Sequence, residues 1–189
     1  MTDEERAKLF PVVLSEYNLA WPQWYAEEEE LLIRFIGAER IIRVSHIGST
    51  AVPGLIAKPT IDILLEIDKG TDIEKLIVAL PESEYICLRQ QTIPSHDIAV
   101  FYKGYTATGF AERVYHIHVR YPGDWDEPHF RDYLIANPEE AKAYAALKQR
   151  LVAQFEHDRD GYTKAKGALI KTMTMRARNA GQDSLLEEL

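Results

Sequence analysis

A short polar turn between two apolar segments narrows the range of folds open to this sequence more than any other feature. Residues 40–47 are apolar enough to form a strand, and residues 60–67 form a nearly continuous apolar run, as in a buried central strand. Between them lie Gly48-Ser49-Thr50 and a compact turn at 51–58. A glycine-serine turn presents backbone N–H groups to an anion, and a strand carboxylate shortly after it can hold a cation. The segment therefore predicts a phosphate site with a metal ion beside it.

The composition is that of a single domain, or of one domain with a helical appendage. With 189 residues, 46% of them hydrophobic, the chain is long enough to bury a full core, so we expect one domain over residues 1–189. The net charge of −8 disfavours an extended nucleic-acid surface, because such a surface needs clustered Lys and Arg.

The cysteine content and the hydropathy pattern indicate where such a protein works. The lone Cys87 permits no internal disulfide, which is typical of a reducing compartment. The first residues lack the layout of a signal peptide, and no apolar run approaches the ~20 residues of a membrane span. We therefore expect a soluble, cytoplasmic protein without a membrane partner. The sequence leaves its oligomeric state open.

The hydrophobic periodicity predicts a helix, then a sheet, then a run of helices. Helices are expected at 22–37, 72–80, 130–136, 138–155 and 158–179, and strands at 40–47, 60–67, 85–88, 97–102 and 113–120. The last two strands should form a hairpin around a loop at 104–109, and residues 181–189 should be frayed. This order predicts an α+β fold: a small mixed β-sheet within about 40–120, an N-terminal helix, and a C-terminal helical part within about 126–179. The apolar stripe of the helical part is expected in the core and comprises Phe130, Leu134, Tyr144, Leu147, Leu151 and Phe155.

Two acidic residues of the second strand are candidate metal ligands. Asp62 lies inside the apolar run, and a buried carboxylate without a partner is costly. Its partner is either a metal ion or a basic residue, Lys58 or Arg43. Glu66 shares the face of Asp62 but lies nearer the strand end, where a solvated carboxylate is more typical than a ligand.

Three histidines extend the candidate site. His116 and His118 are two residues apart on a strand, so both imidazoles project from one face and suit one metal, or one ligand and one general base. A polar sheet face bearing two histidines is the alternative. Two imidazoles and one carboxylate match transition-metal preferences. His46 shares its direction with Gly48 and either enters the same crevice or packs at the strand end.

The phosphate-binding candidates are Gly48, Ser49, Thr50 and Lys58. The first three offer backbone N–H groups and hydroxyls, although an ordinary turn with Ser49 as a cap has the same sequence. Lys58 can pair with a phosphate or with Asp62. Among the helical residues, Lys148, Tyr162 and Lys166 are interpreted as surface or packing residues.

Several separated motifs closely resemble those of GrpB family proteins. They are His46-Ile-Gly-Ser-Thr-Ala-Val-Pro-Gly-Leu55, Lys58-Pro59, Ile61-Asp62-Ile63, Tyr115-His-Ile-His-Val119, Phe130-Arg-Asp-Tyr-Leu134, Tyr144-Ala-Ala-Leu-Lys148 and Tyr162-Thr-Lys-Ala-Lys166. They occur in the family's order and cover the chain from about Trp21 to Arg178. Related domains also occur fused to dephospho-coenzyme A kinases.

The resemblance implies a nucleotidyltransferase fold of the polymerase-beta-like superfamily. In that superfamily a Gly-Ser turn holds a nucleoside triphosphate, and paired strand acids bind magnesium or manganese. Gly48-Ser49 and Asp62 match these positions, but Leu64 replaces the second acid, and His116 and His118 stand where a third acid is expected. This departure favours a single-metal site or a softer metal such as zinc or nickel.

The functional hypothesis is a metal-dependent nucleotidyltransferase that acts on a nucleoside triphosphate and an unknown acceptor. Asp62, His116 and His118 would be its catalytic residues and, with His46 and Glu66, its candidate metal ligands. The alternative is a non-catalytic, nucleotide- or metal-binding regulatory or chaperone-like module of the same fold. A hydrolase built on the histidine pair and Asp62 also fits these residues, but no motif supports it.

Overall fold

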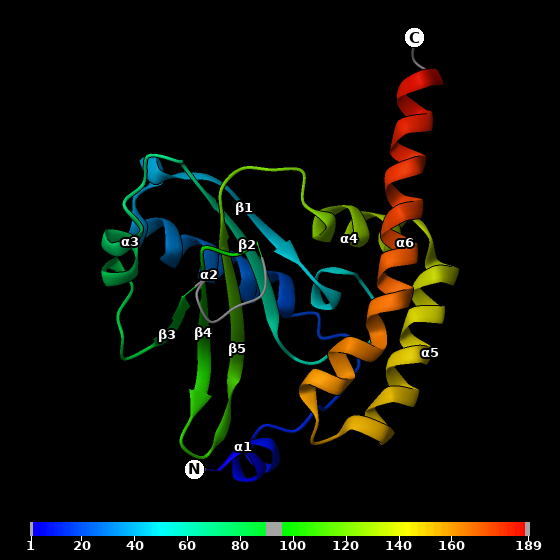
Figure 1. Ribbon diagram of the computed structural model, residues 1–189, viewed down its shortest axis with the longest axis horizontal. Coiled ribbons are helices and arrows are strands. Elements are labelled where there is room, and N and C mark those ends of the chain that lie inside the picture. The colour runs from blue at the N-terminus through cyan, green and yellow to red at the C-terminus, as the bar shows by residue number, and fades with distance from the viewer. Residues whose placement is uncertain (1, 90–95, 188–189) are drawn as a thin grey trace. The chain divides into compact units, whose positions relative to one another are not determined.

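The computed structural model describes residues 2–89 and 96–187 and confirms an α+β protein with a mixed sheet (Figure 1). By their internal contacts the residues form two compact units. The sheet unit comprises Asn18–Ala51 and Pro59–Asp124. The helical unit comprises Met1–Tyr17, Val52–Lys58 and Trp125–Leu189. The division follows the expected sheet core and helical part, while the single domain over 1–189 stays a prediction.

The sheet unit contains the five expected strands. They are β1 (Ile41–Ile47), β2 (Ile61–Ile67), β3 (Tyr85–Arg89), β4 (Ala99–Thr106) and β5 (Gly109–Arg120), in the order β1-β2-β5-β4-β3. Only β2 and β5 run parallel among these neighbours, and the other pairs are antiparallel. The parallel pair lies inside the sheet, which explains why 61–67 is so apolar.

The β4–β5 hairpin is longer than the sequence predicted. The expected loop at 104–109 is largely paired, and only the turn around Ala107 and Thr108 separates the strands. The pairing register shifts between Lys103 and Tyr105. Gly104 lies at this bulge with φ of +87°, and a Cβ there would come within 2.2 Å of the Arg113 carbonyl oxygen. The glycine therefore allows the strands to continue past the bulge instead of ending at it.

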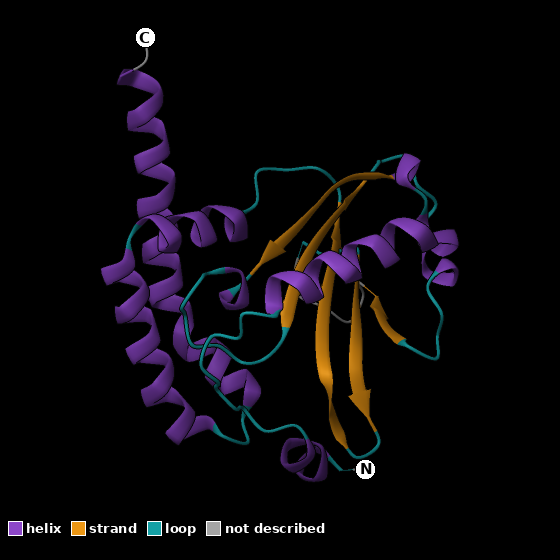
Figure 2. Cartoon of the chain, turned by 180° about the vertical axis from the view of Figure 1, so that it is seen from behind, coloured by secondary structure: helices purple, strands orange, loops and turns teal. Residues whose placement is uncertain are grey.

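One face of the sheet is covered by helix α2 (Trp21–Ile36), which lies across the strands in Figure 2. The helix buries Trp21, Leu32 and Ile36. Its buried Glu28 accepts hydrogen bonds from the Tyr85 hydroxyl at 2.6 Å and from the Lys103 ammonium at 2.9 Å. Because strand side chains alternate, the opposite face carries the polar positions of β2 and β5.

The remaining helix of the sheet unit confirms a sequence prediction. Helix α3 (Ile73–Ala79) begins after Asp72, whose carboxylate accepts a hydrogen bond from the Glu74 N–H at 3.1 Å. This side chain satisfies one of the free N–H groups at the helix start. Two short 3-10 turns, η1 (Ala38–Arg40) and η2 (Ser49–Ala51), flank β1.

The helical unit contains α1 (Asp3–Leu9), α4 (Asp126–Ala136), α5 (Pro138–Phe155) and α6 (Arg159–Glu187). Helix α5 has the predicted bounds and starts at its proline. A core cluster of the helical unit joins the turn after η2 to helices α4, α5 and α6. It consists of Val52, Leu55, Phe130, Leu134, Tyr144 and Met173. This confirms the predicted stripe at Phe130, Leu134 and Tyr144.

Three helices differ from the predictions by more than one residue. Helix α1 was not expected, and α4 starts four residues earlier than predicted. The expected fraying of 181–189 is wrong for the residues described, because α6 continues to Glu187. Gly181 does not end the helix, since one interior glycine costs only about 1 kcal/mol. No helix in the described ranges is long and apolar enough to cross a bilayer.

Candidate metal centre

The polar face of the sheet brings three predicted ligands together. Asp62 on β2 and His116 on β5 are direct partners in the parallel register, and His118 follows on the same face opposite Leu64. One ligand atom from each of the three residues lies within 4.8 Å of the other two. The His116 Nδ1 atom is 3.3 Å from the Asp62 Oδ1 atom. All three side chains are partly exposed, so an ion from solvent can reach them.

A buried carboxylate orients His118. Asp97, only 2% exposed, places its Oδ2 atom 2.9 Å from the His118 Nδ1 atom and accepts a second hydrogen bond from the Arg120 guanidinium. Burial raises the pKa of Asp97, but the hydrogen bonds and charges of His118 and Arg120 outweigh it and lower this pKa to about 2. Asp97 is therefore ionised, and His118 donates its Nδ1 proton to it. The Nε2 atom of His118 remains to bind a metal.

The same network acts on the charge of His118. Burial lowers the pKa of His118, whereas its hydrogen bond to Asp97 and the charges of Asp62 and Asp97 raise this pKa, and the net shift is upward. A protonated imidazole cannot bind a metal, so protons and metal ions compete for this side chain.

His116 is oriented by a tyrosine. The Tyr105 hydroxyl lies 2.7 Å from the His116 Nε2 atom, and the Tyr102 ring packs edge-on against the imidazole with centroids 4.8 Å apart. When Nε2 carries the proton and donates it to Tyr105, the Nδ1 atom that faces Asp62 keeps its lone pair. In this tautomer His116 presents a ligand atom toward the carboxylate.

The glycine-serine turn lies directly against the Asp62 carboxylate. Gly48 has φ of +73°, and a Cβ built on it would be 2.5 Å from the Asp62 Oδ2 atom. Gly48 is therefore required both by the backbone conformation and by the approach of the carboxylate. Ser49 opens η2, while the buried Thr50 hydroxyl donates to the Thr60 carbonyl at 3.1 Å. The predicted turn and the predicted acid are thus neighbours. The Thr50 hydroxyl, predicted to contact a phosphate, instead makes a hydrogen bond within the protein.

Two other predicted ligands have different partners. The His46 Nε2 atom is 3.0 Å from the Thr50 hydroxyl, and its ring stacks on Tyr25 with centroids 4.9 Å apart. Glu66 is 1% exposed, so the expectation that it is solvated is wrong. It pairs with Arg43, its cross-strand neighbour, and accepts the Gly123 N–H at 3.0 Å. Neither residue belongs to the cluster of three ligands.

Lys58, predicted to contact a phosphate or Asp62, belongs to the helical unit by its contacts. Its ammonium lies 5.6 Å from the centroid of the Tyr162 ring. The expected alternative partner of Asp62, Arg43, is the residue paired with Glu66.

Sequence reasoning did not find Asp97, Arg120 or Tyr105. The alternation His116, His118, Arg120 places all three residues on one face and would have revealed the arginine. Asp97 and Tyr105 become visible only through the pairing of β4 with β5, because no local pattern links them to the histidines.

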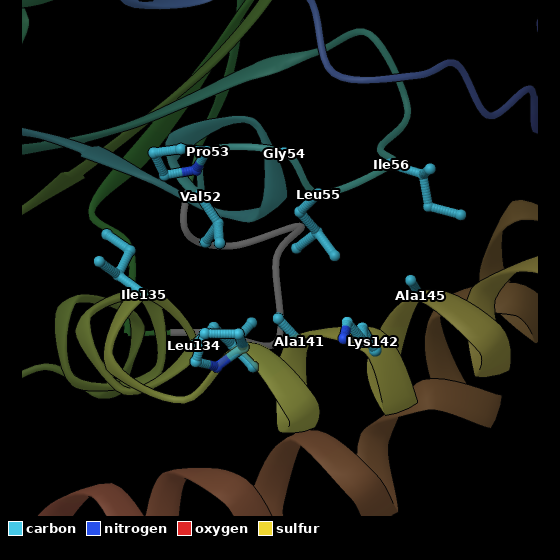
Figure 3. Close-up of a pocket in the computed structure, with 11 residues that line it drawn as sticks. Val52, Pro53, Gly54, Leu55, Ile56, Leu134, Ile135, Ala141, Lys142 and Ala145 are labelled. Carbon is cyan, nitrogen blue, oxygen red and sulfur yellow. The ribbon is translucent and has the colours of Figure 1, made fainter.

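A cavity of about 280 Å³ lies in the helical unit and is separate from this cluster. Figure 3 shows the turn residues Val52–Ile56 facing Leu134, Ile135 and Ala141 of α4 and α5. The lining is mainly aliphatic, with Lys142 and backbone as its polar part. Such a lining offers few convergent polar groups for chemistry.

The fold and the site define an α+β protein with a candidate centre of two histidines and one aspartate. The chain matches the GrpB protein family over residues 11–176 and belongs to that family. A UPF0157 protein of Pseudomonas aeruginosa is 34% identical over 186 residues, which are 98% of this chain and 73% of that protein. The crystal structure of the conserved protein GrpB from Enterococcus faecalis superposes with a TM-score of 0.75 at 28% identity, covering 90% of this chain and 99% of that chain.

One relative has a name that states an enzyme activity. A dephospho-CoA kinase of Mycolicibacterium paratuberculosis is 27% identical over 179 residues, which are 82% of this chain but only 44% of the kinase. The chain thus spans less than half of that protein.

Proposed function

We propose that this protein binds one divalent metal ion at Asp62, His116 and His118 and transfers a nucleotidyl group from a nucleoside triphosphate to an acceptor. The observation that carries the proposal is the convergence of the three ligand atoms within 4.8 Å, next to the glycine-serine turn. The hydrogen bonds from His118 to Asp97 and between His116 and Tyr105 support it, because metal-bound histidines are usually held this way.

The donor set favours some metals over others. Two imidazoles and one carboxylate suit zinc, nickel or manganese better than magnesium, which prefers an all-oxygen shell. A bound ion would neutralise negative charge on a phosphate group and polarise it for attack. Asp62 and the two histidines would hold the ion in place, and the glycine-serine turn beside Asp62 is where the phosphate oxygens would lie.

The test measures metal and nucleotide binding together. Isothermal titration with manganese and a nucleoside triphosphate should give one metal per chain for wild type, and at least tenfold weaker binding for Asp62→Ala and His118→Ala. His157→Ala is a matched control, because His157 is exposed and hydrogen-bonds to Ala7 in the helical unit. Equal affinity in all four proteins, or none in any, would contradict the proposal.

A non-catalytic role is the second candidate, and Leu64 favours it. This fully buried leucine occupies the position where the resemblance implies a second acid, opposite His118. A site with one carboxylate gathers two hard cations poorly. One tightly bound zinc or nickel ion with no pyrophosphate released from any triphosphate would support this role over transfer.

A further inference from the structure

Two lysines of the helical unit lie over the ring of one buried tyrosine, and a third, buried lysine lies over a neighbouring tyrosine of the same unit. Lys166 of α6 places its ammonium 4.4 Å from the centroid of the Tyr162 ring, and the Lys58 ammonium lies 5.6 Å from the same centroid. Lys148 of α5 is 2% exposed and donates to the Ile56 carbonyl oxygen. Its ammonium lies 4.6 Å from the centroid of the Tyr144 ring. The sequence alone indicated only packing or surface roles for Lys148, Tyr162 and Lys166.

This arrangement is electrostatically costly. Burial lowers the pKa of Lys148, and the charges of Lys166 and Lys58 lower it further, to about 7. The positive charges of Lys166 and Lys58 therefore reach the buried Lys148 ammonium and disfavour its charged form. A packing role alone does not require charge at the end of a side chain as buried as Lys148.

Among the described residues, the Tyr162 hydroxyl is an unpaired donor on the ring that Lys58 and Lys166 face. Its side chain is fully buried, and its hydroxyl makes no hydrogen bond with any residue in the described part of the chain. Buried hydroxyls are usually paired, so this one indicates a missing acceptor. Ammonium groups and a phenol O–H are all donors, and several lysines together form a strong point-charge site for phosphate oxygens.

We propose that Lys58, Lys148 and Lys166 form a binding site for a phosphate-bearing anion in the helical unit, beside the Tyr162 ring. Lys58 and Lys166, which are partly exposed, contact the anion. Lys148 is buried and gains a positive charge when the anion binds. The site is assigned without reference to the metal centre, so it goes beyond the proposed function and does not rest on it.

The test is a titration with inorganic pyrophosphate, with inorganic phosphate and ATP as further arms, all in EDTA at low ionic strength. Pyrophosphate should bind to wild type, and its affinity should fall about tenfold or more in Lys58→Met and in Lys166→Met, since each removes a charged contact. Lys164→Met is the matched control, because Lys164 lies two residues from Lys166 on α6 but is exposed. Its affinity should equal that of wild type. ATP binding without pyrophosphate binding would overturn the assignment to phosphate groups.

A second readout follows the protons. An anion beside Lys148 should raise the pKa of this lysine, so pyrophosphate binding at pH 8 should take up more protons, or release fewer, in wild type than in Lys148→Met. Titrations in two buffers of different ionisation enthalpy measure this difference, and the proton of pyrophosphate itself contributes equally to both proteins. Absence of pyrophosphate binding to wild type, or the same proton exchange in both proteins, would overturn the proposal.

One further variant separates this site from the metal centre. Asp62→Ala should bind pyrophosphate in EDTA as well as wild type does, even if it loses metal. Loss of binding in Asp62→Ala with full binding in both lysine variants would place the anion elsewhere and refute the lysine site.

Discussion

The His118 imidazole and the Asp97 carboxylate are joined by a hydrogen bond of 2.9 Å between Nδ1 and Oδ2. Asp97 is almost completely buried, and Arg120 holds its other oxygen. The bond fixes both the tautomer and the direction of the imidazole. It therefore makes Asp97 a positioning residue for the candidate metal centre, although it is not one of the three ligands.

Replacing Asp97 tests this role. Asp97→Asn removes the charge that holds the His118 tautomer, and we expect metal affinity to fall about 10- to 100-fold while the three ligands remain. Cobalt titration followed by absorbance reports both the affinity and the coordination geometry. Asp132→Asn, at a 63% exposed side chain, is the control and should bind as wild type does. Unchanged affinity in Asp97→Asn would mean that His118 does not need this carboxylate.

Tyr105 should act in the same way on His116. Tyr105→Phe keeps the ring and removes only the hydroxyl 2.7 Å from the His116 Nε2 atom. We expect a smaller loss of metal affinity, about tenfold, because the ring contacts remain to hold the imidazole. The measurement is the same titration, with Tyr121→Phe, a 37% exposed residue, as control. Equal losses in the two variants would rule out a specific effect of Tyr105.

Gly48 should be intolerant of a side chain for two separable reasons. In Gly48→Ala the added methyl meets the Asp62 carboxylate at 2.5 Å, and the residue keeps a positive φ. Gly54→Ala introduces the backbone strain alone, because φ of Gly54 is +77° and no atom lies within 4 Å of the added methyl group. Both variants should lose about 1–2 kcal/mol of unfolding free energy from strain. Only Gly48→Ala should lose more than this and also lose metal binding.

Urea denaturation and metal titration of the two glycine variants provide the comparison. If Gly54→Ala loses as much stability and as much metal binding as Gly48→Ala, the contact with Asp62 has no role. Intact metal binding in Gly48→Ala would show that Asp62 can move without leaving the site.

Lys148 should give the stability of the protein a characteristic pH dependence. An unperturbed lysine has a pKa of 10.5. In the folded protein, burial and then the charges of Lys166 and Lys58 lower the pKa of Lys148 to about 7. Between these values the unfolded chain binds the additional proton, so the free energy of unfolding rises with pH, by at most about 1.4 kcal/mol per unit. The free-energy cost of burying the charged form of Lys148 is complete below pH 7 and absent above pH 10.5.

Lys148→Met removes this titration, so its free energy of unfolding should rise less between pH 7 and pH 9 than that of wild type. Urea unfolding at three pH values measures the slopes. Lys171→Met, at an exposed position on the same unit's helix α6, should keep the wild-type slope. Parallel slopes for Lys148→Met and wild type would show that Lys148 titrates normally.

Much of the secondary structure could be predicted from the sequence because capping residues, prolines and apolar runs act on their near neighbours. Pro138 starts α5, Asp72 caps α3, and the apolar run after Thr60 is a central strand. The same local logic predicted that Asp62 needs a partner and that His116 and His118 share a face. Each of these inferences depends on neighbours within a few residues, where periodicity and capping act.

The errors have causes in strand pairing. Gly104 indicated a loop, yet it lies at a bulge within paired strands, and Glu66 near a strand end indicated exposure, yet it is buried against Arg43. In both cases a partner on another strand decides the outcome, and no local pattern identifies that partner.

The amino-acid order alone thus determined most of the helices and strands, which family the motifs resemble, and which five side chains were candidate ligands of one ion. Only the tertiary structure decided that Asp62 stands beside His116, that Asp97 holds His118, and that His46 and Glu66 have other partners. The physical reason is that strand pairing joins segments far apart in the chain, and the register of that pairing is set by the whole buried face, not by any local pattern.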